Sequence, residues 1–328
     1  MPSSQRHNVL ITVMFALMMF VGAAETSAQP YPSKPIKIVV PFTPGGSNDV
    51  LARTIAQKLS ESWGRPVVVE NRPGAAGNIG ADAVAKAAPD GYTLLVAANS
   101  VLSINPILNE GTAFNPLNDF APISLIGAVP ILLVTNPTVP AHSVKDLIAL
   151  GKAKAGGLTY GSAGLGSPQH VSAELFASMA GIKMQHVPYR GANPLVTDLL
   201  SGQIELAFGP INSILPLVKS GKLRALGVTT DKRLQYLPDV PTISEELPGY
   251  ETDIWIALVA PAGTPQAIVA KLAGQVHEIF KLSDVRERLS EQGIEPKTST
   301  ADDLSRLIKA DLARWAKLIK QTGASPNR

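Results

Sequence analysis

The amino-acid sequence predicts an α/β protein of two lobes, each a mostly parallel sheet flanked by helices, with a two-strand hinge between the lobes. Short β-branched runs alternate with amphipathic helical patterns, as in parallel sheets covered by helices. The order of strand, glycine-rich loop and helix occurs twice along the chain. A chain of 328 residues is also long enough for about two domains of roughly 150 residues each.

The segment over residues 1–28 is predicted to be a signal peptide and to take no part in the fold. Its apolar run, residues 9–24, is shorter than the about 20 residues that a spanning helix needs. Thr26, Ser27 and Ala28 then provide the small residues that suit signal peptidase. We expect cleavage near Ala28 and export of the mature chain. The alternative is that the run remains as a membrane anchor.

The first lobe is predicted to begin with a strand over residues 35–42, a β-branched run bounded by prolines. The glycine-rich loop 43–49 follows it and leads into a helix over 50–63. Gly64 suits the position just past the end of that helix. The lobe continues with a strand at 67–70, a helix at 79–88 and a strand at 92–97. This β-α-β-α-β order implies parallel strands joined by right-handed crossovers.

The second lobe is predicted to repeat that order from a strand at 158–162. The glycine-rich loop 163–168 follows and leads into a helix over 169–179. Ser167 is the expected N-cap of this helix and Pro168 lies in its first turn. The remaining elements are a strand at 184–189, a helix at 194–200 and a strand at 204–208.

Two further apolar stretches, residues 130–135 and 254–260, lie where one lobe would join the other. If both cross, the second lobe is an insertion, with residues 29–132 and 256–328 forming lobe 1 and residues 133–255 forming lobe 2. Three amphipathic helices follow, beginning at Thr264-Pro265, at Ser283 and at Thr300, with the last ending at Gly323. We expect these helices to pack on the first lobe. The alternative is a third, small helical domain.

Composition and motifs exclude several function classes. The chain has no Cys, and its formal net charge of +3 is too small and too scattered to indicate nucleic acid. The glycine-rich loops match neither the nucleotide P-loop nor the dinucleotide fingerprint. A nucleophile elbow would need Gly where Tyr160 precedes Ser162, and the five His are scattered. We therefore expect no enzyme activity, no cofactor and no metal, and we interpret the pair Ser167 and His170 as structural.

The two glycine-rich loops are the predicted ligand site. In open parallel sheets, ligands bind beyond the carboxyl ends of the strands, where loops lead into helices. Glycine permits close approach to the backbone, and a helix N-terminus offers unpaired N–H groups that attract an anion. The nearest candidate cation is Arg190, which follows the second strand of lobe 2. The alternative is that both loops are tight turns that need glycine for geometry alone.

Several motifs occur in a fixed order from Tyr31 to the last helix. They include Pro41-Phe42-x-Pro44-Gly45-Gly46, Val69-Glu70-Asn71-Arg72-Pro73-Gly74, Pro89-Asp90-Gly91-Tyr92, Ile104-Asn105-Pro106, Tyr160-Gly161-Ser162-Ala163-Gly164, Ser167-Pro168-Gln169-His170, Val187-Pro188-Tyr189-Arg190-Gly191 and Leu237-Pro238-Asp239-Val240-Pro241. With these motifs the chain resembles the substrate-binding receptors of tripartite tricarboxylate transporters, also called the Bug receptors.

The resemblance implies a type II-like, two-lobe periplasmic binding protein. Such a receptor closes on a di- or tricarboxylate or related organic acid and delivers it to membrane subunits, acting as a monomer without a cofactor. Carried over, the ligand-binding residues lie in the first loop of each lobe, with a weaker candidate at the exit of the third strand. Together with the cation they are Phe42, Thr43, Pro44, Gly45, Gly46, Ser47, Asn48, Asp49, Asn99, Ser100, Gly161, Ser162, Ala163, Gly164, Leu165, Gly166, Ser167, His170 and Arg190.

Two positions depart from the pattern of many relatives. Ser47-Asn48 stands where Gly or Ala and then Thr is common, and Gly209 stands where Asp is common. A ligand therefore cannot simply be taken over from a relative. Two other functions stay open, a sensing accessory of a signalling system and a secreted hydrolase of small acids.

Overall fold

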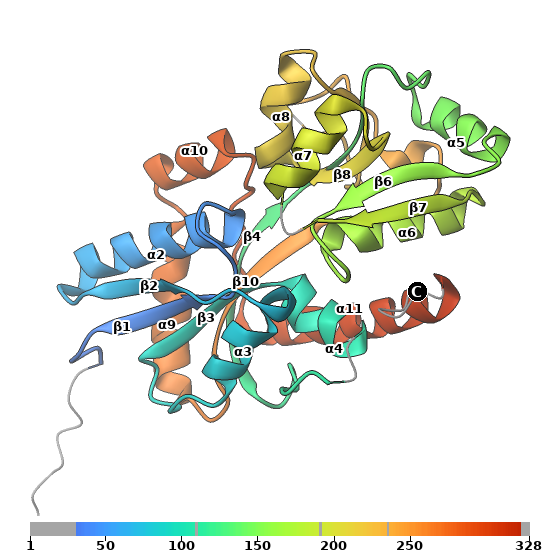
Figure 1. Ribbon diagram of the computed structural model, residues 1–328. Coiled ribbons are helices and arrows are strands. Elements are labelled where there is room, and N and C mark those ends of the chain that lie inside the picture. The colour runs from blue at the N-terminus through green and yellow to red at the C-terminus, as the bar shows by residue number, and fades with distance from the viewer. Residues whose placement is uncertain (1–30, 109–110, 190–191, 235, 323–328) are drawn as a thin grey trace, which may run out of the picture. The chain divides into compact units, whose positions relative to one another are not determined.

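The structure, a computed structural model, describes residues 31–108, 111–189, 192–234 and 236–322 (Figure 1). The predicted signal peptide, Arg190 and the predicted helix end at Gly323 lie outside these residues. Within them the chain forms two five-stranded sheets, here called sheet A and sheet B. The predicted α/β fold class is confirmed.

Sheet A has the strand order β2-β1-β3-β10-β4. Its strands are β1 (Ile36–Val40), β2 (Val67–Asn71), β3 (Thr93–Ala98), β4 (Phe120–Val129) and β10 (Ile254–Pro261). β1 pairs in parallel with β2 and β3, whereas β10 pairs antiparallel with β3 and β4. The predicted β-α-β-α-β run is present, and the sheet is mostly parallel as predicted: only β10 runs against the other strands, because the chain returns to the sheet in the opposite direction.

Sheet B has the order β7-β6-β8-β5-β9 and is mostly parallel in the same way. Its strands are β5 (Ile131–Thr135), β6 (Leu158–Ser162), β7 (Met184–Pro188), β8 (Leu206–Pro210) and β9 (Arg224–Val228). β6 runs parallel to β7 and β8, and β5 runs antiparallel to β8 and β9. The predicted strands at 158–162, 184–189 and 204–208 correspond to β6, β7 and β8.

The chain changes sheets at the ends of two strands. β4 of sheet A ends at Val129, and β5 of sheet B begins two residues later, after Pro130. On the return, the Thr252 N–H donates to the Thr229 carbonyl beside sheet B, and β10 then begins at Ile254. Each predicted joining stretch therefore lies within one sheet, and the crossings fall just outside it. The lobe boundaries remain a prediction.

Helices flank both sheets (Figure 1). Beside sheet A lie α2 (Ser47–Trp63), α3 (Asn78–Ala85), α4 (Asn105–Leu108), α9 (Gln266–Ile279), α10 (Ser283–Glu291) and α11 (Ala301–Thr322), with short turns η1 (Ala75–Gly77) and η2 (Ser100–Ile104). Sheet B is accompanied by α5 (Val144–Ala153), α6 (Pro168–Ala180), α7 (Ala192–Ser201), α8 (Ile211–Lys219) and the turn η3 (Ile243–Glu245).

The core over one face of sheet A shows why these segments are amphipathic. Leu304 and Ile308 of α11 join Val84 of α3 and the strand residues Leu95 and Ala257 in one buried cluster. The intervening strand residues face the other side, where α2 packs on β1, β2 and β3. Both faces are thus covered by helices, and the strand ends remain as the edges from which loops can reach a ligand.

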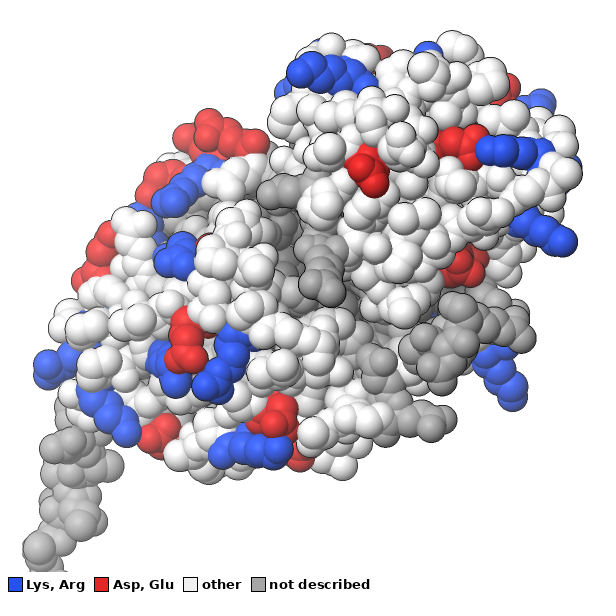
Figure 2. All heavy atoms as spheres, in the orientation of Figure 1, with Lys and Arg blue, Asp and Glu red and all other residues white. Residues whose placement is uncertain are grey.

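Charge and hydropathy agree with the composition. On the face shown in Figure 2, Lys and Arg are scattered among Asp and Glu and form no single basic patch. In the part of the chain that the structure describes, no helix combines the length and the apolar character that crossing a bilayer would require.

Candidate functional site

The first glycine-rich loop joins the end of β1 to α2, and its two glycines leave the loop backbone accessible to a ligand. Gly45 has a φ of +92°, which favours glycine, whereas Gly46 has a φ of −80° and occupies the N-cap of α2. A Cβ placed on either glycine would meet no atom within 4 Å. No side chain caps this helix. The unpaired N–H groups of its first turn are therefore available to an anion.

The conformation of this loop is held by Asp49, which is only 4% exposed. Its Oδ2 accepts hydrogen bonds from the Gly45 N–H at 3.0 Å and from Arg53 Nε at 2.9 Å. Its Oδ1 accepts from Asn71 Nδ2 at 2.8 Å, and the same amide group also donates to the Phe42 carbonyl. Both oxygens of Asp49 are thus used inside the loop.

Asp49 stays ionised in this setting. Burial raises the pKa of the carboxyl group, but the hydrogen bonds from Arg53, the Gly45 N–H and Asn71 outweigh burial and lower the pKa below its usual value. Asp49 balances the charge of Arg53, because Arg53 Nε donates to the Asp49 carboxylate. Arg53 Nη2 donates to Asn71 Oδ1. The predicted binding residue Asp49 therefore shapes the loop and offers a ligand no free oxygen.

The second glycine-rich loop joins β6 to α6 and follows the same plan. Gly164 and Gly166 have φ values of +121° and +73°, which favour glycine. The Ser167 N–H donates to the Gly164 carbonyl at 3.1 Å, which closes the loop into a tight turn. Ser167 Oγ accepts from the His170 N–H, so the predicted N-cap of α6 is confirmed.

Ser162, at the end of β6, has all its hydrogen-bonding capacity in use. Its Oγ donates to the Gly164 carbonyl and accepts from the Gly164 N–H, both at 3.1 Å. It also lies 2.6 Å from His186 Nε2. Either atom can be the donor in this last contact, depending on the tautomer of His186. Ser162 is thus held by its own loop and by β7.

Below the loop, three rings form a stack. Tyr160 of β6 and His186 of β7 are paired in the sheet register, and their ring centroids lie 4.9 Å apart. His170 of α6 stacks on His186 at 4.3 Å. Burial lowers the pKa of His170 to about 4. The pKa of His186 is also about 4, because burial and the neighbouring His170 lower it more than Glu174 raises it. Both imidazoles are thus neutral near pH 7.

The two loops lie at contacts between sheet A elements and sheet B elements. Asn212 of α8 donates from Nδ2 to Ser47 Oγ of the first loop at 3.1 Å. In the second loop, a Cβ on Gly166 would lie 3.2 Å from Asn105 Oδ1 of α4. Asn105 Nδ2 in turn donates to the Ala76 carbonyl. Each loop therefore touches the elements that carry the other sheet.

The other candidate residues differ in their surroundings. Asn99 and Ser100, at the exit of β3, are buried, and Asn99 Nδ2 donates to the Asp253 carbonyl at 2.9 Å. In the first loop Thr43 and Pro44 are exposed, and Leu165 in the second loop is 41% exposed. The half-buried residues are Phe42, Asn48 and Ala163, and Gly161 is buried.

Sequence reasoning missed three residues that shape the site, namely Asn71, Asn105 and His186. Asn71 and Asn105 lie in the family motifs, but the spacing of residues within these motifs does not indicate which side chains they contact. Asn71 reaches Asp49 across 22 residues and His186 reaches Ser162 across 24. Among the described residues there is no group of three metal-ligating side chains that could hold an ion.

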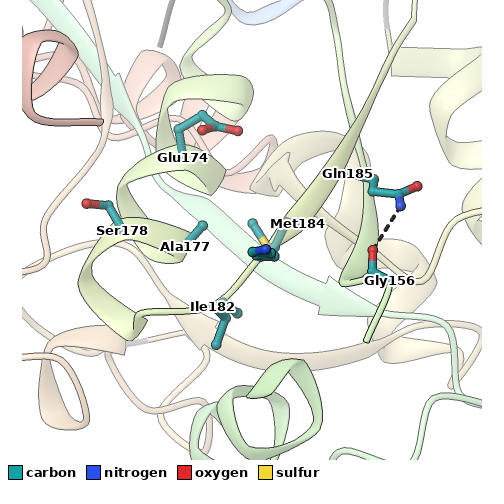
Figure 3. A pocket seen from close by; sticks show the side chains of 8 residues that line it. Gly156, Glu174, Ala177, Ser178, Ile182, Met184 and Gln185 are labelled. Atoms are coloured by element: carbon teal, nitrogen blue, oxygen red, sulfur yellow. Dashed lines mark hydrogen bonds between the residues drawn. The ribbon is translucent and has the colours of Figure 1, made fainter. Parts of the chain in front are cut away.

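A pocket of about 490 Å³ lies elsewhere on the sheet B elements, between α6 and the start of β7 (Figure 3). Glu174 and Ser178 line it from α6, and Met184 and Gln185 line it from β7. Gln185 Nε2 donates to the Gly156 carbonyl at its edge, at 2.8 Å. None of the predicted ligand-binding residues lines this pocket.

Comparisons with known proteins agree over nearly the whole chain. Residues 51–324 match the family described as tripartite tricarboxylate transporter family receptor. Protein BugT of Bordetella pertussis is 40% identical over 304 residues, which cover 92% of this chain and 93% of that protein.

Solved structures show the same fold. The structure of R. palustris Rpa4515 with adipate has a TM-score of 0.84 and 39% sequence identity, and the match covers 90% of this chain and 99% of that one. The periplasmic binding protein BugD has a TM-score of 0.81 and 33% identity, with 90% and 99% of the two chains covered.

Proposed function

The chain belongs to the receptor family of tripartite tricarboxylate transporters, and we propose that it binds a small dicarboxylate or related organic acid between its two glycine-rich loops. It would then deliver this acid to the membrane subunits of such a transporter. The observation that carries the proposal is the pair of glycine-rich loops, each opening a helix and each in contact with elements of the other sheet.

An anion suits this arrangement better than a neutral or cationic solute. The partial positive charge of a helix N-terminus stabilises an anion by roughly 0.3–1 kcal/mol, and hydrogen bonds from the loop N–H groups add to this. The one carboxylate in the first loop, Asp49, is already neutralised by Arg53. A ligand with an acidic group at each end would place one group at each loop. The adipate bound to Rpa4515 is a molecule of this kind.

The periplasm is the proposed location. The apolar run and the small residues that precede Gln29 suit export, and BugD is a periplasmic binding protein. N-terminal sequencing of the protein recovered from the periplasmic fraction is expected to start near Gln29. A protein that retains Met1 would contradict cleavage.

A hydrolase is the less favoured function. Ser162 lies 2.6 Å from His186, which resembles a nucleophile beside its base. However, the base of a nucleophile is itself oriented by a third group, and no described carboxylate bonds His186. The Gly164 N–H also donates to Ser162, which holds the hydroxyl in the loop. Release of product from a carboxylic ester or amide, lost in Ser162→Ala, would revive this alternative.

The receptor function is tested by binding. Calorimetry and thermal unfolding with a panel of C4 to C8 dicarboxylates, adipate among them, are expected to reveal at least one ligand that raises the melting temperature. The same ligand should reduce the radius of gyration in solution scattering, because contacts with both loops favour a closed form. A panel without any binding acid would contradict the proposal.

The position of the ligand is tested at Gly46. Its φ of −80° is open to any residue and its Cβ direction is empty, so Gly46→Val should lower the unfolding free energy by less than about 1 kcal/mol. The valine side chain would nevertheless obstruct approach to the loop backbone, and we expect affinity to fall at least about tenfold. Gly156→Val is the matched control, since this glycine is also exposed with empty space around it. Unchanged affinity in Gly46→Val would place the ligand elsewhere.

A further inference from the structure

Two imidazole rings contact the second glycine-rich loop, one near each end, His186 from β7 and His170 from α6. His186 bonds Ser162 at 2.6 Å, and Ser162 bonds both the N–H and the carbonyl of Gly164. His170 Nδ1 accepts the Gly166 N–H at 3.2 Å. A change in the protonation of either ring would therefore alter the hydrogen bonds of the loop backbone.

A backbone hydrogen bond identifies the proton on His170. Nδ1 of His170 is an acceptor, so this neutral imidazole carries its proton on Nε2. His186 Nε2 lies 2.6 Å from Ser162 Oγ and holds that hydroxyl in place. His170 Nε2–H has no partner among the described residues. In this neutral form Nε2–H is a donor of the kind that a carboxylate oxygen accepts.

A charged His170 is incompatible with this loop. A second proton on Nδ1 would point at the Gly166 N–H, so two donors would face each other. A charged His170 would also stack on His186 with ring centroids 4.3 Å apart. The described titratable groups around it are His186, Tyr160 at 6.5 Å and Glu174, and the Glu174 carboxylate is already bonded by the Tyr160 hydroxyl at 2.6 Å. No described carboxylate bonds either imidazole.

We propose that the ligand-binding shape of the second loop exists only while His170 is neutral, and that His186 is a positioning residue that holds His170 and Ser162 in place. His170 would act on the loop through Nδ1 and on the ligand through Nε2–H. This inference rests on the proposed function, because it concerns the same carboxylate site. Acid would therefore weaken binding, although a cationic histidine would by itself attract the anionic ligand.

Two substitutions separate the two nitrogens of His170. In His170→Asn the side-chain oxygen can replace Nδ1 as acceptor for Gly166, but the donor at Nε2 is lost. In His170→Gln the amide nitrogen can replace the Nε2–H donor, but the acceptor at Nδ1 is lost. Each variant is expected to bind adipate, or the tightest acid of the panel, about tenfold more weakly at pH 7.5, since each loses one hydrogen bond.

The pH profile distinguishes the proposal from simple attraction of charges. The wild type and His170→Asn are compared by calorimetry between pH 7.5 and 4.5, because protonation of the acid itself cancels in the ratio of their affinities. We expect this ratio to be constant down to about pH 5.5 and to fall below it. A ratio that rises in acid would overturn the proposal, since it would mean that a cationic His170 binds the ligand.

The role of His186 has its own readout. His186→Gln keeps a polar partner for Ser162 and should bind within about threefold of the wild type, whereas His186→Leu should bind about tenfold more weakly. Equal losses in the two variants would contradict a positioning role. His142→Asn is the matched control, because His142 is exposed and its N–H donates to Asp146 at the start of α5.

The free protein provides a test that needs no ligand. Nitrogen-15 NMR of the imidazole rings is expected to show the Nε2–H form of His170 at pH 7. The Gly166 amide resonance should move as His170 titrates, and it should not move in His170→Asn. A Gly166 amide resonance that does not move during the titration of His170 overturns the inference, even if acids bind. If no acid of the panel binds, the receptor function fails, and the NMR result still decides whether the loop depends on His170.

Discussion

At the scale of single residues, Asp49 shows how a buried charge can organise a backbone. The carboxylate accepts from one N–H group of its own loop and from two side chains that reach it from the helix and the next strand. Replacing it leaves those donors unpaired, which costs more than the net worth of the hydrogen bonds themselves.

Asp49→Asn is therefore expected to lower the free energy of unfolding in urea by about 1–3 kcal/mol. Ligand affinity should fall as well, because Gly45 loses the acceptor that fixes its position. Asp146→Asn, in the first turn of α5, is the control: this aspartate is exposed and accepts from the His142 N–H away from the loops. If Asp49→Asn were no less stable than Asp146→Asn, the loop would not depend on this carboxylate.

The two buried histidines make stability depend on pH. The pKa of His170 is about 4 in the folded protein and near its ordinary value of about 6.5 in the unfolded chain. Between these values the unfolded chain binds more protons, so the free energy of unfolding falls as the pH is lowered from about 6.5 to 4. Urea unfolding at pH 7 and pH 5 should show a loss of order 1–3 kcal/mol that is smaller in His170→Asn. An identical loss in both proteins would contradict this.

The residues that sequence reasoning found differ from those it missed in how far along the chain their hydrogen-bond partners lie. The cap formed by Ser167 and the His170 N–H spans three residues, so the spacing alone predicts it. His186 meets Ser162 and Tyr160 only because β7 lies beside β6 in a particular register. Asn105 reaches Ala76 across 29 residues. Partners of this kind are set by the packing of elements, which one sequence does not reveal.

At the scale of elements, helix ends were predictable, whereas the antiparallel direction of β5 and β10 was not. Gly64 ends α2 in the left-handed conformation, and Thr300 Oγ1 accepts from the Asp303 N–H at the start of α11. β4 was not predicted, since Pro122 interrupts its pattern, although its partner β10 was recognised as a strand. The orientation of β10 depends on where the chain re-enters sheet A, and local propensity carries no information on that.

The N-cap of α6 combines a structural with a functional role, and a second helix provides its control. Ser167→Ala and Ser143→Ala each remove a serine cap, of α6 and α5 respectively, and each should lower the free energy of unfolding by about 1 kcal/mol. Only Ser167→Ala should also weaken ligand binding, because its cap orients the helix N-terminus next to the second loop. Chemical denaturation and calorimetry measure the two effects. Equal affinity in both variants would remove Ser167 from the site.

At the scale of the whole molecule, polar and apolar contacts join elements of the two sheets. Besides the hydrogen bond from Asn212 to Ser47, Val171 of α6 packs in one buried cluster with Leu108 of α4 and Trp315 of α11. The Asn212 hydrogen bond lies at the first glycine-rich loop, where it can influence closure.

Asn212→Ala tests that influence. The substitution removes the amide that donates to Ser47, and one neutral hydrogen bond is worth about 0.5–1.5 kcal/mol. If the contact belongs to the closed form, ligand affinity should fall about two- to tenfold with little change in the unfolding of the free protein. Ser213→Ala is the control, since that hydroxyl bonds the Pro210 carbonyl within its own turn. A decrease in affinity of the same size in Ser213→Ala would argue against a role in closure.

The place of β10 between β3 and β4 has a consequence for the order in which the molecule can assemble. All five strands of sheet B lie in one stretch, from Ile131 to Val228, so all of them have left the ribosome before β10 does. The strand that joins β4 to the rest of sheet A arrives only at Ile254–Pro261. Until then β4 has no neighbour in its sheet, and the half of the molecule that is begun first is finished last.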